Sequence, residues 1–158
     1  MIMNRILNSL LFAALALLIG PGCGESHHHH HPSGGGHRHA SPRGGVAVEL
    51  GDHQFHLDVL HDREAGVLGV WVMDAHAEHF VRVPWANLDL TVQAGSEVHA
   101  LSLVPVANDA TGETAGNTSQ FRAEAEWLKG LERFTATVPA IEIRGQRFSD
   151  VRFEYPER

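Results

Sequence analysis

Apolar and polar residues alternate along much of the chain after residue 45, with the period of two that indicates half-buried β-strands. Segments 46–50 and 55–59 place valine, leucine or phenylalanine at every second position. Segment 67–73 is apolar on both faces, as in a central strand that is covered on each side. The same pattern predicts further strands at residues 80–83, 88–92, 98–104, 134–138 and 151–155.

Turn and breaker residues separate these strands. Residues 62–66 are expected to form a hairpin turn, and residues 108–118 a polar loop. Residues 124–130 favour a short helix that Gly130 can end. A last hairpin is predicted around Gly145-Gln146, a two-residue turn with glycine first, as type II′ requires. We therefore predict an all-β fold for residues 46–158, an antiparallel β-sandwich or small barrel of about eight or nine short strands with one short helix.

The first 22 residues have a different pattern. Arg5 precedes ten apolar residues at positions 10–19, which is the layout of a secretory signal and too short for a membrane-crossing helix. Cys23, the only cysteine, directly follows Gly22. The segment resembles a bacterial lipoprotein signal, in which the cysteine is acylated and becomes the mature N-terminus. This implies a signal peptide at 1–22 and a periplasmic protein that Cys23 anchors by lipid to the inner or outer membrane; ordinary cleavage nearby is the alternative.

Residues 23–45 are rich in Gly, Ser, Pro and His and lack periodic apolar positions, so we expect a flexible linker. Of the 13 histidines in the chain, seven lie in this segment. Imidazole binds Zn, Cu, Ni and Co ions, and adjacent imidazoles on a flexible chain can rearrange around the ion that is present. The predicted metal ligands of the linker are His27, His28, His29, His30, His31, His37 and His39. The alternatives are a purification tag and a hydrophilic spacer.

Histidines and carboxylates also gather in the predicted strands. If His61 lies opposite Val67 across the turn, the register brings four residues together at the far end of that hairpin, Asp52, His53, Asp74 and His76. Such a group suits Zn or Cu(II). The candidate ligands of the folded part are His53, His56, Asp74, His76 and His79. A histidine hydrogen-bonded to a carboxylate, without a metal, is the alternative.

Other side chains are expected to have structural roles. By the strand alternation, His56 and Asp58 point away from the face of Phe55, and they are predicted to form an outward pair. His99 begins an otherwise apolar strand, so a structural role is favoured over a ligand role. The three tryptophans are expected to pack in the core, namely Trp71, Trp85 and Trp127.

Charge and motifs argue against several classes of function. The formal net charge is −7, and because only Arg5 is charged before Cys23, the remainder carries 11 basic and 19 acidic residues. This acidity argues against nucleic-acid binding. The sequence has no phosphate-binding glycine loop, no Gly-x-Ser-x-Gly elbow, no His-Glu-x-x-His and no paired-cysteine motif, so no enzymatic activity is expected. A small metalloenzyme is a third alternative, and its candidate catalytic metal ligands would be Asp74, His76 and His79.

Residues 43–58 (Arg-Gly-Gly-Val-Ala-Val-Glu-Leu-Gly-Asp-His-Gln-Phe-His-Leu-Asp) and residues 70–79 resemble a His-rich periplasmic domain. That domain occurs in small bacterial lipoproteins and in adaptor subunits of heavy-metal efflux pumps. There a His-Gly-Gly triplet precedes the first strand, whereas this chain has Arg43. The resemblance implies a β-rich domain, a role near metal efflux or resistance, and no catalytic residues. An efflux adaptor or another envelope protein is then a candidate partner.

These observations predict a lipid-anchored periplasmic protein that buffers or delivers divalent or copper ions and catalyses no reaction. Because protons compete for every imidazole, metal affinity is expected to fall between about pH 7 and 5. The alternative is a β-rich interaction module of the cell envelope with no specific metal role.

Overall fold

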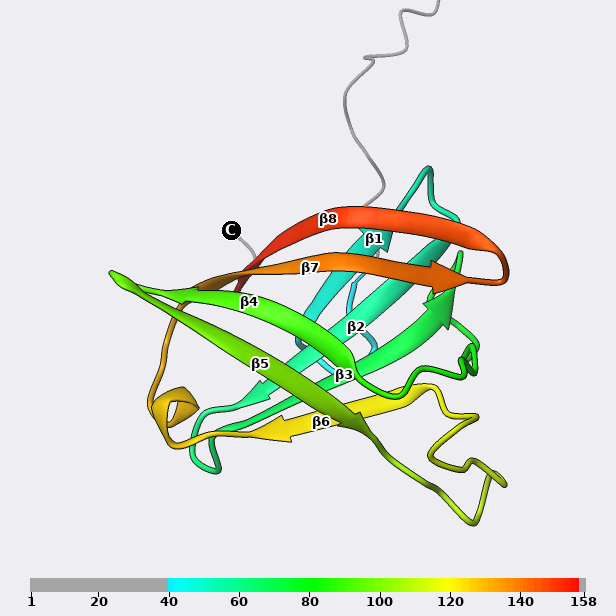
Figure 1. Ribbon diagram of the computed structural model, residues 1–158, viewed down its shortest axis with the longest axis horizontal. Helices are drawn as coiled ribbons and strands as arrows, with labels where there is room; N and C mark the ends of the chain where they lie inside the picture. The colour runs from blue at the N-terminus through cyan, green and yellow to red at the C-terminus, as the bar shows by residue number, and fades with distance from the viewer. Residues whose placement is uncertain (1–39, 157–158) are drawn as a thin grey trace, which may run out of the picture. The chain divides into compact units, whose positions relative to one another are not determined.

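The computed structural model describes residues 40–156. Within them, eight strands form one antiparallel sheet in the order β1-β2-β3-β6-β5-β4-β7-β8. The sheet curls into a nearly closed barrel in which the two edge strands, β1 and β8, contact each other (Figure 1). The predicted all-β fold is therefore confirmed, and its form is that of a small barrel. The predicted signal peptide, Cys23 and the seven histidines from His27 to His39 lie outside the described residues.

The described residues contain eight strands and one short helix. Most strands are joined to their neighbours by tight turns, and a short 3₁₀ helix, η1, stands between β6 and β7. Their bounds are β1 Val46–Leu50, β2 Phe55–Asp62, β3 Val67–Asp74, β4 Leu88–Ala94, β5 Glu97–Pro105, β6 Gln120–Glu124, η1 Glu126–Leu128, β7 Phe134–Ile143 and β8 Gln146–Tyr155.

Alternate residues of each strand point into the barrel and fill it. The side chains that are at most 1 % exposed include Leu50, Leu57, Val72, Leu103, Phe121 and Ile143. Trp85 and Trp127 pack against this core as predicted. The prediction is wrong for Trp71, which lies on the outer face of β3, where its ring covers Gly69 so closely that a Cβ there would lie 2.8 Å from a ring atom.

Two segments differ from the prediction. Residues 80–83, expected as a strand, form only the isolated bridges Met73–Phe80 and Val83–Thr118. On this edge β3 is paired with β6 from Val67 to Trp71. Beyond that ladder, Met73 forms only the single bridge with Phe80. Because residues 120–124 belong to β6, the predicted helix at 124–130 is reduced to the single turn of η1.

The last hairpin turns one residue earlier than predicted. Ile143 pairs with Gln146, so the central residues are Arg144 and Gly145, with φ of 51° and 80°. Positive φ at both positions defines a type I′ turn, whose twist matches that of the flanking strands. The predicted type II′ turn at Gly145-Gln146 is therefore wrong.

The hairpin of β2 and β3 also differs from the prediction by one residue. Asp62 pairs with Val67, and His61 pairs with Leu68 rather than with Val67. The Asp62 carboxylate shapes the turn by accepting hydrogen bonds from the backbone N–H groups of Glu64 and Ala65, each 3.0 Å long. At the far end the ladder stops at Phe55 and Asp74, so it does not pair Asp52 or His53 with residues beyond Asp74.

The segment before β1 covers the outer face of β2. Asp58 points outward but is fully buried, because Arg43 forms an ion pair of 2.7 Å with it and the Ser41 hydroxyl donates a hydrogen bond to it. The Arg43 guanidinium lies 4.3 Å from the Trp71 ring centroid and 5.0 Å from that of Phe80. Ser41 and Arg43 are therefore held against the outer face of β2 and β3.

Candidate metal site

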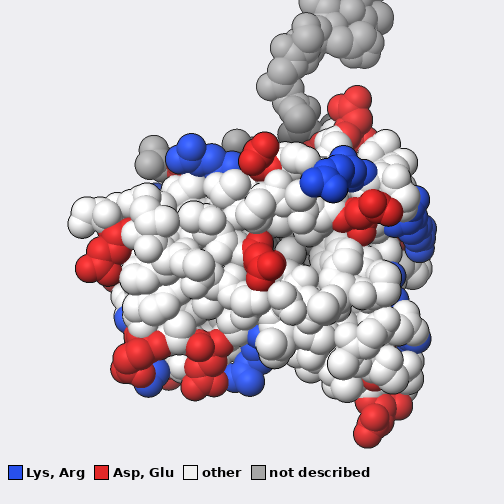
Figure 2. Space-filling model, in the orientation of Figure 1, with Lys and Arg blue, Asp and Glu red and all other residues white. Residues whose placement is uncertain are grey.

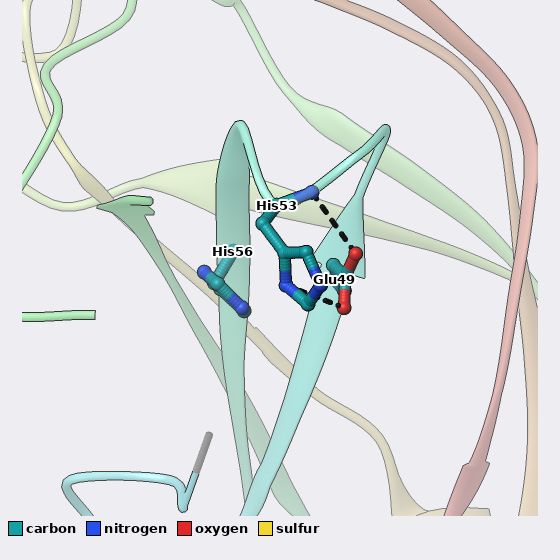
Figure 3. Close-up of side chains that lie close together, drawn as sticks. All are labelled: Glu49, His53 and His56. Carbon is teal, nitrogen blue, oxygen red and sulfur yellow. Dashed lines mark hydrogen bonds and ion pairs between the residues drawn. The ribbon is translucent and has the colours of Figure 1, made fainter. Parts of the chain in front are cut away.

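Three potential ligands come together where β1 turns into β2. One ligand atom each of Glu49, His53 and His56 lies within 4.8 Å of the others. Figure 3 shows the His53 ring between the Glu49 carboxylate on β1 and the His56 ring on β2. These three residues are candidate metal ligands, and the name metal site stands for this candidate cluster below.

The β1–β2 ladder places two of these residues side by side. Glu49 and His56 are direct partners across the two strands, and both point to the outer face. The ladder ends at the next pair, Leu50 and Phe55, and the four residues between them form the turn. This turn returns His53 to the same side as Glu49.

Glu49 holds His53 at two points. Glu49 Oε1 accepts a hydrogen bond of 3.0 Å from the His53 backbone N–H, and Glu49 Oε2 lies 3.1 Å from His53 Nδ1. His53 has a φ of 52°, a left-handed conformation that is unfavourable for a residue with a side chain. The contacts with Glu49 stabilise this conformation and orient the ring.

His56 is the buried member of the metal site, at 2 % exposure. Its Nδ1 lies 3.1 Å from the backbone carbonyl oxygen of Asp74. A carbonyl oxygen can only accept, so Nδ1 carries the proton and, in the neutral ring, Nε2 presents a lone pair. Histidines that bind metals commonly donate their second N–H to a carbonyl in this way.

The metal site is closed on one side and open on the other. The side chains of Glu49 and His53 are 38 % and 48 % exposed, whereas His56 lies beneath them. Two imidazoles and one carboxylate suit Zn or Cu(II), and a fourth position remains for water or another ligand.

The other predicted ligands lie in the next turn. The Asp74 carboxylate accepts hydrogen bonds from the backbone N–H groups of Glu78 and His79, at 3.0 and 3.2 Å, and lies 2.9 Å from His79 Nδ1. Burial raises the pKa of Asp74, but these hydrogen bonds outweigh burial and lower it to about 2. Asp74 therefore holds the turn that contains the exposed His76, and the predicted meeting of Asp52, His53, Asp74 and His76 is replaced by the metal site.

His56 and Asp58 do share the face predicted for them, but it is covered rather than exposed. His99 stacks on Trp127 with ring centroids 4.1 Å apart, and its Nε2 lies 3.2 Å from a Glu97 oxygen. Sequence reasoning missed Glu49 as a candidate ligand. The available signal was the spacing, because a four-residue turn after Leu50 sets Glu49 opposite His56.

Comparison with protein-family models, with curated proteins and with solved structures gives no significant match to this chain. Among residues 40–156, we find no helix with the length and apolar character needed to cross a membrane.

Proposed function

We propose that this protein binds transition-metal ions, Zn, Cu, Ni or Co, and buffers or delivers them in the bacterial cell envelope. The observation that carries the proposal is the clustering of Glu49, His53 and His56 around one point. The sequence supports it independently, because seven further histidines stand between residues 27 and 39. Within the same proposal, residues 1–22 are a signal peptide and Cys23 carries the lipid anchor.

The two groups of histidines would act differently. Residues 27–39, called the histidine-rich segment below, offer many exchangeable imidazoles without a set geometry, which favours capture of several kinds of ion. The metal site offers three ligands in a defined arrangement, which favours ions that accept two imidazoles and a carboxylate. Capture by the first and retention by the second constitute buffering and need no catalysed reaction. Delivery would be to an efflux adaptor or another envelope protein.

Calorimetric titration with Zn and Cu(II) tests this proposal. We expect the full chain to bind several ions, a chain without residues 27–39 to bind one, and His53→Ala in that shortened chain to abolish the remaining site. His76→Ala is the matched control, since His76 is also an exposed turn histidine. Absence of binding by the full chain would refute the function, and unchanged stoichiometry after shortening would refute the role of the histidine-rich segment.

A second candidate function is a protein-interaction module of the envelope. β5 and β6 are paired only through Val104 and Pro105, and a groove of about 440 Å³ lies beside this short ladder, lined by Leu101, Val104, Ala123 and neighbouring residues. Val104 is 59 % exposed. Most of the face seen in Figure 2 is uncharged, with the charged side chains mainly around its edge. Metal-independent capture of one envelope protein, lost in Val104→Asp, would favour this function.

A further inference from the structure

A pocket opens between β4 and β7, and none of its residues belongs to the metal site. The ladder between these two strands has three pairs and ends at Thr91 and Thr137. Figure 1 shows the strands diverging beyond it. Continued in the same register, the ladder would set Asp89 opposite Pro139. Because proline has no backbone N–H to donate, Pro139 favours the end of the ladder and the gap beside it.

The size and the walls of this pocket suit a small molecule. Its volume is about 440 Å³, within the range of roughly 300–1,000 Å³ that is usual for small-molecule sites. Residues 139–141 of β7 and the Trp85 side chain line it. Trp85 Nε1 donates a hydrogen bond of 2.9 Å to the Glu142 carbonyl oxygen, and the ring packs on Phe121 with centroids 5.4 Å apart. These contacts fix the ring, so this wall is formed before any ligand binds.

The ionisable side chains of the pocket are both acidic, namely Asp89 and Glu142. Asp89 Oδ1 accepts a hydrogen bond of 2.6 Å from the Ser102 hydroxyl, which lies on the other side of β4 from the pocket. Asp89 Oδ2 accepts no hydrogen bond from the described residues, and neither carboxylate forms an ion pair with one of them. Arg147 is the partner of Glu142 on β8, on the far side of β7. The pocket therefore offers two carboxylates and no basic side chain.

We infer that this pocket binds a small organic ammonium ion, that is, an alkyl amine that is protonated at neutral pH. The ammonium group donates hydrogen bonds to the carboxylates of Asp89 and Glu142, and such bonds between ionised groups are stronger than neutral ones. The Trp85 ring attracts the cation through its π electrons, and the alkyl chain packs on residues 139–141. Phosphates and other anions are disfavoured, because no basic side chain lines the pocket. The inference goes beyond the proposed function and does not depend on it.

Titration of the metal-free full chain, followed by nuclear magnetic resonance, tests the inference. The readout is the signal of the Trp85 indole N–H, which is assigned by its loss in Trp85→Phe. We expect n-butylammonium to shift this signal saturably at constant ionic strength. The matched ligand n-butanol has the same carbon chain without the charge, and we expect it to bind about tenfold more weakly.

Three variants locate the binding. Asp89→Asn and Glu142→Gln each remove one carboxylate charge, and each should raise the Kd of n-butylammonium about tenfold. Ala140→Phe narrows the pocket but keeps both carboxylates, so it should abolish the saturable shift. The control is Asp109→Asn, which removes an equal charge from the exposed loop before β6 and should change the Kd by less than about twofold.

Several outcomes would overturn the inference. One is the absence of a saturable shift in the unsubstituted chain, and another is an equal loss of affinity in Asp89→Asn and Asp109→Asn. Equally tight binding of n-butanol or of glucose would show that the positive charge is not recognised. Nα-acetyl-lysine amide separates a free amine from the lysine side chain of a partner protein. Binding no tighter than that of n-butylammonium supports a small-molecule ligand, and tighter binding would contradict it.

Discussion

The two faces of β2 each carry a buried histidine, and the two residues have opposite surroundings. His56 and His61 are 2 % and 6 % exposed. On the outer face, His56 lies beside Glu49 and the Asp74 carbonyl. On the inner face, His61 packs edge-on against Phe134 and Tyr155, with ring centroids 5.6 and 5.7 Å away. Burial alone therefore does not identify a histidine as a candidate ligand, because the neighbouring groups decide whether it can bind an ion. The alternation along the strand decides which neighbouring groups each side chain contacts.

The surroundings of the inner histidine, His61, favour its neutral form. Its Nε2 lies 3.0 Å from the Leu128 carbonyl oxygen, and its Nδ1 is buried with no hydrogen-bond partner among the described residues. Burial lowers the pKa of His61, and the opposing effect of the Leu128 carbonyl is smaller. The outer face instead provides partners for its polar groups, as the ion pair of Asp58 with Arg43 shows.

The largest effect is expected from removing the partner of a buried charge on the outer face. Arg43→Ala leaves the fully buried Asp58 carboxylate without its counter-ion, and we expect a loss of about 3–5 kcal/mol in the free energy of unfolding. The matched control is Arg63→Ala, which breaks the exposed ion pair with Glu132 and should cost at most about 1 kcal/mol. Denaturant unfolding measures both; similar losses would show that Asp58 does not depend on Arg43.

The next effect concerns the inner histidine. His61→Ala removes a ring from the core, and we expect a loss of about 2–4 kcal/mol from the cavity that remains. His61→Phe keeps an aromatic ring beside Phe134 and Tyr155 and should cost less. Thermal unfolding compares the two variants, and equal losses would mean that hydrogen bonding to Leu128, rather than packing, is the contribution of His61.

Zinc binding should depend on the outer histidine, His56, and not on the inner histidine, His61. His56→Gln keeps a donor for the Asp74 carbonyl but removes the imidazole, so zinc affinity of the metal site should fall at least tenfold, or about 1.4 kcal/mol. His61→Phe should leave zinc affinity unchanged. Chelator competition measures both, and a loss of affinity in His61→Phe would contradict the separation of the two faces.

The smallest effect is a pH dependence of stability that belongs to His61. Because its pKa in the folded protein is lowered below the ordinary 6.5, the unfolded state takes up the proton first. Stability should therefore be full above pH 6.5 and fall as the pH drops through 6.5 toward the lowered pKa. Metal-free unfolding between pH 7.5 and 5 should give a flatter profile for His61→Phe; an identical profile would assign the pH dependence to other groups.

The local alternation of apolar and polar residues was sufficient to predict the all-β class of fold. Period-two alternation identified strands at most of their true positions, and the same parity correctly placed His56 and Asp58 on the face opposite Phe55. The weak signal of residues 120–124 was missed, because β6 is a strand only through its pairing with β3 and β5. A strand of this kind is stabilised by residues distant in the sequence, which local alternation does not contain.

The composition of the metal site depended on the way the strands are paired. The β2–β3 ladder ends at Phe55 and Asp74, which removed the expected pairing of His53 with residues beyond Asp74. The four-residue turn after Leu50 brought His53 to Glu49 instead. Residues 41–45 then buried an outward face that alternation alone predicts to be exposed. Covalent geometry sets the alternation of side chains between the two faces of a strand, so the sequence alone predicts it. The pairing register of the strands and the burial of their outer face depend on turn conformation and long-range packing. Both form only when the whole barrel folds.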